Sequence, residues 1–320
     1  MMMYLSLAAG LVVLLLCGDL LVRGAAGLAE RAGLSPLIIA LTVVALGTSM
    51  PELVVSVSAA LRGSPDIALG NVVGSNIANI LLVLGLPAML YPIVCSHHAL
   101  RLNTAFMLAA SGLLIAFCLV GPLTRGEGQL LLVALGLYLL WSGWDATRYP
   151  ADAIEQTVDT ITKVEHMPRL TIAGFIFVGC VGLPIGAHLV VEGGTAMARG
   201  LGVSDAVIAL TLIAVGTSLP ELATSLMAAV RKRHDVAIGN VIGSNIINIL
   251  AILGVTSLIM PLPVAPNFLR LDLWVMLLAA FAIVPTVLAR GTITRSKGAL
   301  FVAAYVAYVY AIFHNAGEMI

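Results

Sequence analysis

Residues 35–52 read SPLIIALTVVALGTSMPE, and residues 204–221 read SDAVIALTLIAVGTSLPE. Each stretch is followed by a second shared motif, DIALGNVVGSNIANI at 66–80 and DVAIGNVIGSNIINI at 235–249. The two copies align without a gap at a constant offset of 169 residues. The repeat therefore predicts a chain that arose by internal duplication, with the same polar motif embedded in apolar sequence in each half.

The composition is that of a membrane protein. Hydrophobic residues make up 60% of the chain and charged residues only 10%, far from the averages of soluble domains. The formal net charge is zero, which provides no basic footprint for nucleic acid. We therefore expect an integral membrane protein without a nucleic-acid partner.

Ten apolar segments are each long enough to cross a bilayer, for which a helix needs about 20 residues. They are 3–31, 35–61, 66–90, 102–121, 128–144, 170–199, 204–230, 235–261, 271–289 and 298–315. A polar stretch separates five segments from five. The sequence therefore predicts an all-α membrane protein with one integral membrane domain, divided into a first five-helix repeat (1–144), a cytoplasmic linker (145–169) and a second five-helix repeat (170–320).

Five is an odd number, which has a topological consequence. If both halves fold alike, the second half must be inserted upside down relative to the first. Inverted repeats of this kind are the architecture of many secondary transporters, whose binding site lies near the bilayer midplane where the repeats meet. We therefore expect two inverted repeats with one shared site between them.

The basic residues predict the orientation in the membrane, because cytoplasmic loops carry an excess of Lys and Arg. With both termini outside, eleven basic residues fall in cytoplasmic connections and four on the opposite side. The cytoplasmic set is Arg31, Arg101, Arg148, Lys163, Arg169, Arg231, Lys232, Arg233, Arg290, Arg295 and Lys297. The opposite set is Arg62, Arg125, Arg199 and Arg270.

A glutamate lies inside an apolar run in each half. Glu52 and Glu221 occupy matched positions in the second segment of each repeat. An acidic side chain at the centre of a membrane helix costs roughly 2.5–3.5 kcal/mol even on the lenient insertion scale, so such residues are usually functional. Two of them at matched positions predict one site to which both halves contribute.

A proline precedes each glutamate and disturbs its helix. Pro51 and Pro220 each lack a backbone N–H and clash with the carbonyl about four residues earlier. The carbonyls of residues 45–48 and 214–217 are therefore expected to lose their helical partners, and in hydrocarbon they must be satisfied by protein, water or an ion. Carbonyl and carboxylate oxygens together form the hard donor set that Ca²⁺ takes and that also suits Na⁺.

The second motif supplies neutral oxygens. Ser75 and Asn79 lie one helical turn apart on one face, as do Ser244 and Asn248. Small residues in the same motif allow close approach of helices. An alternative is that these polar residues only hold helices together through interhelical hydrogen bonds. Their occurrence in two copies, each following a buried Pro-Glu pair, favours an ion site.

Four other polar residues receive structural interpretations. Asp66 and Asp235 stand at the starts of matched helices, where we expect them to act as N-caps rather than as ion ligands. Asp19 and His188 occupy matched positions in the first helix of each half. They are interpreted as polar packing residues, with a role in an ion pathway as the alternative.

GTSMPE with GNVVGSNIAN, and GTSLPE with GNVIGSNIIN, resemble the two α-repeats of the calcium:cation antiporter superfamily, specifically its prokaryotic sodium/calcium exchanger branch. The resemblance covers essentially the whole chain. It implies a ten-helix fold in which the second, third, seventh and eighth helices enclose a site in the middle of the membrane. It also implies an antiporter of the prokaryotic plasma (inner) membrane that exchanges Na⁺ for Ca²⁺ by alternating access, with the Na⁺ gradient driving Ca²⁺ efflux.

Carried over by motif position, the resemblance implies a site of twelve residues. The central Ca²⁺ ligands would be Glu52 and Glu221, with the backbone carbonyls of Thr48 and Thr217. The two flanking Na⁺ sites would be lined by Ala45, Ser49 and Ser75, and by Ala214, Ser218 and Ser244. The middle of the cluster would be closed by Asn79 and Asn248.

Other activities are less well supported by the residues. Potassium-dependent exchangers carry Asp where this chain has Asn248, which argues against a K⁺ requirement. The motif GNVVGSN also differs from the acidic version of proton/calcium exchangers, so an H⁺-coupled or other divalent-cation (Ca²⁺/Mn²⁺) antiporter is the alternative. The sequence has no HExxH pair and no Ser/His constellation for hydrolysis. We therefore expect no enzymatic activity, no cofactor and no obligate protein partner.

Overall fold

Of the 320-residue chain, the computed structural model describes residues 2–97, 99–148, 167–200 and 214–317. Within these ranges seven helices are long and apolar enough to cross a membrane, or eight if the bent pair Pro36–Thr48 and Met50–Leu61 is one span. The all-α membrane class is therefore confirmed. The predicted segment 204–230 and most of the predicted linker extend outside the described residues, so the number of ten spans stays a prediction.

The helices follow one another in a similar order in both halves. The first half contains α1 (Met2–Ala32), α2 (Pro36–Ile39), the π-helix η1 (Ala40–Val44), α3 (Ala45–Thr48), α4 (Met50–Leu61), α5 (Pro65–Ala78), the π-helix η2 (Asn79–Leu84), α6 (Gly85–Leu90), α7 (Ala99–Val120) and α8 (Arg125–Arg148). The second half contains α9 (Arg169–Gly200), α11 (Ala214–Gly216), α12 (Leu219–Val230), α13 (His234–Ile247), the π-helices η6 (Asn248–Leu253) and η7 (Phe268–Asp272), α14 (Gly254–Ile259), α15 (Leu273–Ala282), α16 (Val284–Leu288) and α17 (Arg295–Gly317). Two of the π-helices also correspond, because η2 and η6 begin at the matched residues Asn79 and Asn248.

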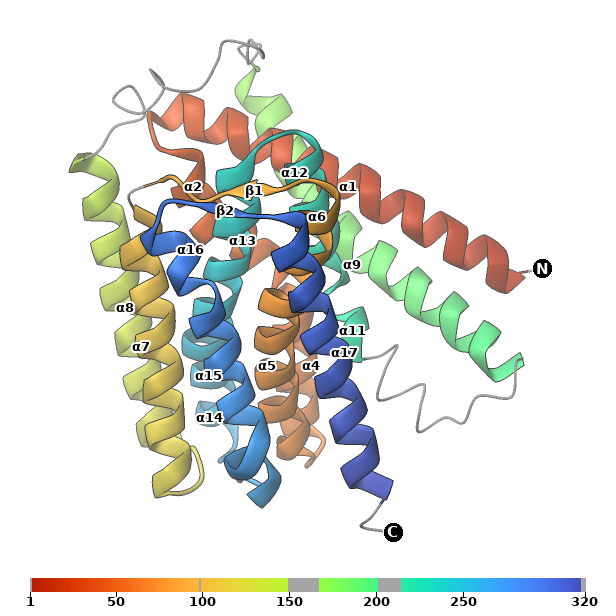
Figure 1. Cartoon of the computed structure of the whole chain (residues 1–320), viewed down its shortest axis with the longest axis vertical. Helices are drawn as coiled ribbons and strands as arrows, with labels where there is room; N and C mark the ends of the chain where they lie inside the picture. The colour runs from red at the N-terminus through yellow and green to blue at the C-terminus, as the bar shows by residue number, and fades with distance from the viewer. Residues whose placement is uncertain (1, 98, 149–166, 201–213, 318–320) are drawn as a thin grey trace.

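Two short pairings of extended chain lie at opposite ends of the bundle. Strand β1 (Ile93–Val94) pairs antiparallel with β2 (Thr292–Ile293) at the upper end in Figure 1. At the lower end, Leu123 lies in the connection that follows α7 and Leu262 in the connection that follows α14. They form an isolated bridge with two backbone N–H···O bonds of 2.9 Å. Leu262 is the repeat equivalent of Ile93. Matched segments at opposite ends are the expected signature of an inverted repeat.

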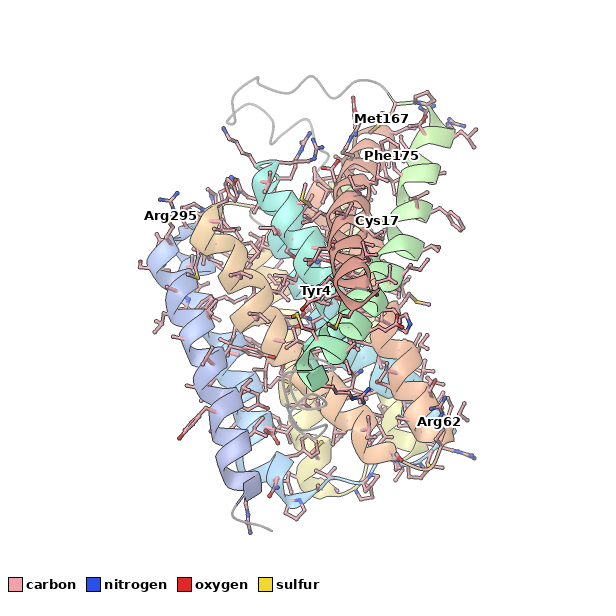
Figure 2. All side chains as sticks on the ribbon, turned by 90° about the vertical axis from the view of Figure 1, so that its right-hand side faces the viewer. Tyr4, Cys17, Arg62, Met167, Phe175 and Arg295 are labelled. Carbon is pink, nitrogen blue, oxygen red and sulfur yellow. The ribbon has the colours of Figure 1, made fainter. Side chains whose placement is uncertain are left out.

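The first helices of the two halves, α1 and α9, lie side by side at a steep angle to the other helices (Figures 1 and 2). Glycines make this contact possible. A Cβ on Gly186 would lie 2.9 Å from the backbone nitrogen of Leu14, and one on Gly193 would lie 2.7 Å from that of Leu7. Only small residues let two membrane helices approach so closely, so this seam depends on its glycines.

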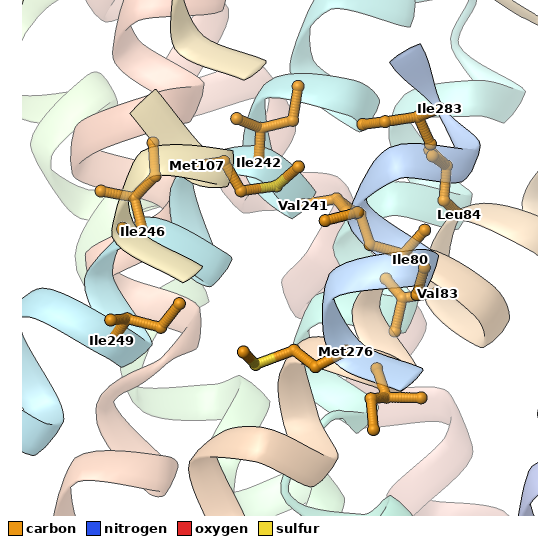
Figure 3. Close-up of a cluster of buried hydrophobic side chains, with 14 of the residues drawn as sticks. Ile80, Val83, Leu84, Met107, Val241, Ile242, Ile246, Ile249, Met276 and Ile283 are labelled. Carbon is orange, nitrogen blue, oxygen red and sulfur yellow. The ribbon is translucent and has the colours of Figure 1, made fainter. Parts of the chain in front are cut away.

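The buried core lies on the third and eighth predicted segments. In the span His234–Ile259, 94% of the apolar window is buried, against 33% for α1 and 28% for α9. Figure 3 shows apolar side chains of this core, among them Ile80, Val83 and Leu84 of η2, Met107 of α7, Val241, Ile242 and Ile246 of α13, and Met276 of α15. The two GN motifs (Gly70–Asn79 and Gly239–Asn248) therefore lie in the most deeply buried part of the described chain.

The polar residues of the first helices are not buried in the core. Asp19 forms an ion pair with Arg231, which follows the last residue of α12. This contact agrees with the packing role expected for Asp19. His188, at the matched position of α9, is exposed. The ion pair therefore links α1 to one end of α12. Asp19 and His188 differ in environment although their positions match in sequence.

The expected N-cap is wrong for the second copy. Asp235 is the second residue of α13, and the capping position is occupied by Arg233, with no capping hydrogen bond from its side chain. The helix begins two residues earlier than expected, so the carboxylate lies in the first turn, where it interacts favourably with the helix dipole instead. The side chain of the matching Asp66 lies outside the described residues.

Candidate ion-binding site

Each Pro-Glu motif begins a new helix. Ser49 interrupts the second segment with φ −84° and ψ 6°, and the helices on either side are bent by 43°. Ser218 does the same in the second copy, with φ −86° and ψ 3°. The two prolines become the second residues of α4 and α12, in the first turn, where a missing N–H removes no hydrogen bond.

The segment before Glu52 is therefore bent rather than unwound. The expectation of a free carbonyl is wrong for Ala45, whose oxygen accepts the N–H of Ser49 at 3.0 Å. A free carbonyl remains a sound expectation at Gly47, because the residue four positions on is Pro51 and has no N–H. The chain thus resolves the proline clash by ending one helix and starting another.

This geometry places both glutamates in the first turn of a helix, at its positive end. Glu52 and Glu221 are both 0% exposed. Their carboxyl groups lie close enough to interact electrostatically. The structure therefore brings together, from two inverted halves, the two acidic side chains that the sequence singled out.

The surroundings of Glu221 come from both halves. Its carboxylate accepts a hydrogen bond of 2.9 Å from the hydroxyl of Ser49. The neighbouring Thr48 donates its hydroxyl to Oδ1 of Asn240 at 3.1 Å. The hydroxyl of Ser244 also lies close to the Glu221 carboxylate, without a hydrogen bond of normal geometry. Side chains of α3, α12 and α13 thus meet around one carboxylate.

Many oxygens in this cluster are buried and unpaired. Among the residues that the structure describes, eight such oxygens belong to predicted site residues: both carboxylate oxygens of Glu52, Oε2 of Glu221, Oδ1 of Asn79 and Asn248, and the hydroxyls of Thr217, Ser218 and Ser244. Native proteins leave few buried polar atoms without partners, because each one is costly. Their concentration at one place indicates a site for a hard cation.

The remaining predicted residues lie on elements that pack against the glutamate-bearing helices or their partners, with one limit. Ser75 is buried on α5, and Ala45 is buried at the start of α3. Ala214 begins α11, and its side chain lies outside the described part of the chain. The twelve candidates thus belong to the two broken helices and to the two helices that carry the GN motifs. These are the four elements that the resemblance implied.

Four asparagines beside the candidates were not predicted as part of the site. Asn71 donates to the backbone oxygen of Glu52 at 3.2 Å and to the hydroxyl of Ser56 at 3.0 Å. Asn240 makes the matching contacts to Glu221 and Ser225, at 3.4 and 3.2 Å. These bonds hold each glutamate-bearing turn against the following helix, as the interhelical alternative suggested. The other two asparagines are Asn76 and Asn245. All four could have been found in the sequence, because each pair is separated by the repeat offset of 169 residues.

The candidate ligands offer oxygen donors. In the ranges that the structure covers, no three His, Cys, Asp or Glu side chains form a group that holds a metal. The charge of the cluster comes from two carboxylates alone, and all other candidate ligands are neutral oxygens. Such a cluster suits cations that prefer oxygen and must also be released.

Gly47, the residue before Thr48, lies close to Cys180 of α9, and the importance of this close approach can be tested. A Cβ on Gly47 would lie 2.5 Å from the sulfur of Cys180 but 3.8 Å from its Cβ. We expect Gly47→Ala to destabilise the protein by about 1–3 kcal/mol, the usual effect of overpacking. Cys180→Ala removes the clashing atom, so the double variant should recover most of the loss. Thermal melting in detergent measures this, and strictly additive effects would contradict the contact.

Together, the fold and the site define an α-helical membrane protein with inverted repeats and a buried, oxygen-lined candidate site for cations. The model of the family described as sodium/calcium exchanger protein matches residues 2–144 and 171–314. The chain therefore belongs to the sodium/calcium exchanger family.

Individual relatives match nearly full length. The chain is 38% identical over 309 residues to the putative antiporter CaxA of Alkalimonas amylolytica, covering 96% of this chain and 97% of that protein. It is 32% identical to the sodium/calcium exchanger MaX1 of Methanosarcina acetivorans, with 97% and 98% covered. A solved structure of the sodium-calcium exchanger NCX_Mj matches with a TM-score of 0.82 at 32% identity, covering 97% of this chain and 98% of that one. The sodium/calcium exchanger fold is thereby confirmed.

Proposed function

We propose that this protein is a secondary antiporter that exchanges Na⁺ for Ca²⁺ across the membrane by alternating access. Two fully buried glutamates, contributed by inverted halves and surrounded by unpaired oxygens, carry the proposal. Membership of the sodium/calcium exchanger family supports it, as does the likeness to an exchanger from Methanosarcina acetivorans. No enzymatic step and no cofactor is needed for this activity.

In this mechanism the charge of the site enforces exchange. Two ionised carboxylates in a low-dielectric interior repel each other and are costly to leave without a counter-charge. One Ca²⁺ balances them, and so does a set of Na⁺ ions. The loaded protein can change between outward and inward states, whereas the change of the ion-free protein is strongly disfavoured. Each ion therefore crosses only in exchange for the other.

The candidate ligands take the following proposed roles. Ca²⁺ is bound by the carboxylates of Glu52 and Glu221 and by the backbone carbonyls of Thr48 and Thr217. One Na⁺ site uses Ala45, Ser49 and Ser75, and the other uses Ala214, Ser218 and Ser244, with Asn79 and Asn248 between them. The neutral amide of Asn248 limits the cluster to two carboxylates, so we propose that K⁺ is not required.

We further propose that the protein lies in the plasma membrane with both termini outside, and that the Na⁺ gradient drives Ca²⁺ out of the cell. The distribution of basic residues supports this orientation. Figure 2 places Arg295 of the proposed cytoplasmic set near the upper end of the bundle, and Arg62 of the opposite set near the lower end. Labelling of engineered cysteines at the two ends of intact cells tests the assignment.

Reconstituted flux tests the function. Purified protein in Na⁺-loaded liposomes should take up radioactive Ca²⁺ as long as Na⁺ is higher inside than outside. Collapsing the Na⁺ gradient should stop uptake, and adding or removing K⁺ should leave it unchanged. Uptake that follows a pH gradient in the absence of Na⁺ would instead establish the H⁺-coupled alternative.

A further inference from the structure

A symmetric set of asparagines and methionines lies where α5 meets α13. Nδ2 of Asn76 donates to the backbone oxygen of Asn245 at 3.3 Å, and Nδ2 of Asn245 donates to that of Asn76 at 3.3 Å. Each amide also faces a sulfur, at 3.8 Å for Asn76 and Met276 and 3.7 Å for Asn245 and Met107. Figure 3 shows both methionines in the apolar cluster. They are matched at the repeat offset, as the asparagines are.

These contacts determine how the first pair of amides is oriented. A carbonyl oxygen and a thioether sulfur are acceptors only, so they require the NH₂ end of each amide. A flipped Asn76 would place its own oxygen against two acceptors in a buried site, which is costly. The Oδ1 atoms of Asn76 and Asn245 are therefore held on the opposite side.

There they accept hydrogen bonds from a second pair of amides. Oδ1 of Asn76 accepts from Nδ2 of Asn248 at 3.1 Å, and Oδ1 of Asn245 accepts from Nδ2 of Asn79 at 3.0 Å. The NH₂ end of each second amide is thus committed, and its oxygen points the other way. In the described part of the chain both of these oxygens are buried and unpaired.

We propose that Asn76 and Asn245 are positioning residues that orient the amides of Asn248 and Asn79 so that oxygen, and not NH₂, faces the cation. This deepens the proposed function and presupposes it. An amide that is free to flip would also turn its N–H donors toward the ion, and N–H groups cannot serve as ligands for a cation. The pairing is crossed, because each half orients the amide of the other half. Assembly of the two halves is therefore needed to complete the ligand set.

A double-mutant cycle tests the proposal on the full-length protein, with apparent Ca²⁺ affinity measured from the rise in melting temperature with added Ca²⁺. We expect Asn76→Ala to weaken Ca²⁺ binding about tenfold, as outer partners of metal ligands do. In the Asn248→Ala background the same change should have almost no further effect on affinity. With Asn79→Ala, which depends on the other positioning residue, the effects should add.

Two further comparisons separate positioning from general destabilisation. Asn76→Asp keeps the acceptor oxygen and, when protonated, also keeps one donor for the backbone oxygen of Asn245, so it should bind Ca²⁺ more tightly than Asn76→Ala. The melting temperature without Ca²⁺ reports any purely structural loss. The proposal is overturned if Asn76→Ala weakens binding equally in both backgrounds, or if Asn76→Asp is as weak as Asn76→Ala.

The mirrored cycle keeps the test possible if Asn76→Ala does not fold. Asn245→Ala should be coupled to Asn79→Ala in the same way, and this cycle does not use Asn76→Ala. Failure of the proposed function has a different signature, since the unmodified protein would then show neither Ca²⁺-dependent stabilisation nor Na⁺-driven Ca²⁺ flux. Normal flux with an uncoupled cycle overturns the positioning role alone.

Discussion

Replacing Glu52 with Gln is expected to abolish Na⁺-driven Ca²⁺ exchange and, at the same time, to make the ion-free protein more stable. Neither carboxylate oxygen of Glu52 has a hydrogen-bond partner among the described residues, and the side chain is 0% exposed. A buried unpaired charge is destabilising by several kcal/mol. Removing it relieves both desolvation and repulsion from Glu221, but it also removes half of the charge that binds Ca²⁺.

The two effects are measured on the same preparation. Melting of the ion-free variant should shift upward, Ca²⁺ should no longer raise it, and flux in liposomes should fall to background. Glu221→Gln should abolish flux equally but stabilise less, since Ser49 already donates to that carboxylate at 2.9 Å. Glu192→Gln, in an exposed position of α9, is the control and should keep both properties. Exchange that survives Glu52→Gln would refute the proposed site.

Gly243→Ala is expected to destabilise the protein by about 3 kcal/mol or more and to remove most transport. A Cβ there would lie 2.5 Å from the backbone oxygen of Leu41 and 2.7 Å from its Cα. Backbone atoms cannot move aside as the end of a side chain can, so α13 must shift away from η1. Overpacking usually costs about 1–3 kcal/mol, and a rigid backbone contact lies at the upper end of that range or beyond it. Ser244, the next residue, would shift with the helix.

Gly112→Ala on α7 is the matched control. Gly112 is exposed, and none of the described atoms lies within 4 Å of a Cβ built there. The change should be neutral or slightly stabilising, because Ala is favoured over Gly in a helix by about 1 kcal/mol. Melting temperature and flux of the two variants are compared directly. Equal behaviour of Gly243→Ala and Gly112→Ala would show that the contact between α13 and η1 does not limit stability.

Local sequence indicated where the helix before Glu52 breaks, but not how the chain is arranged at the break. Pro51 correctly indicated a break before Glu52, but the same proline fits either an unwound segment or a new helix start. The structure shows the second, in which a Pro in the first helical turn loses no hydrogen bond. The π-helices that begin at Asn79 and Asn248 likewise have no local signature.

The amino-acid sequence by itself determined the membrane class, the duplication, and the pair of acidic residues from matched positions. It could do so because apolar spans and a constant repeat offset are properties of the linear chain. Only the tertiary structure decided which polar atoms are consumed by packing and which are left for an ion. The amide of Asn248 is oriented by Asn76, far away in sequence and in the other half, so its free oxygen exists only after the two repeats have assembled.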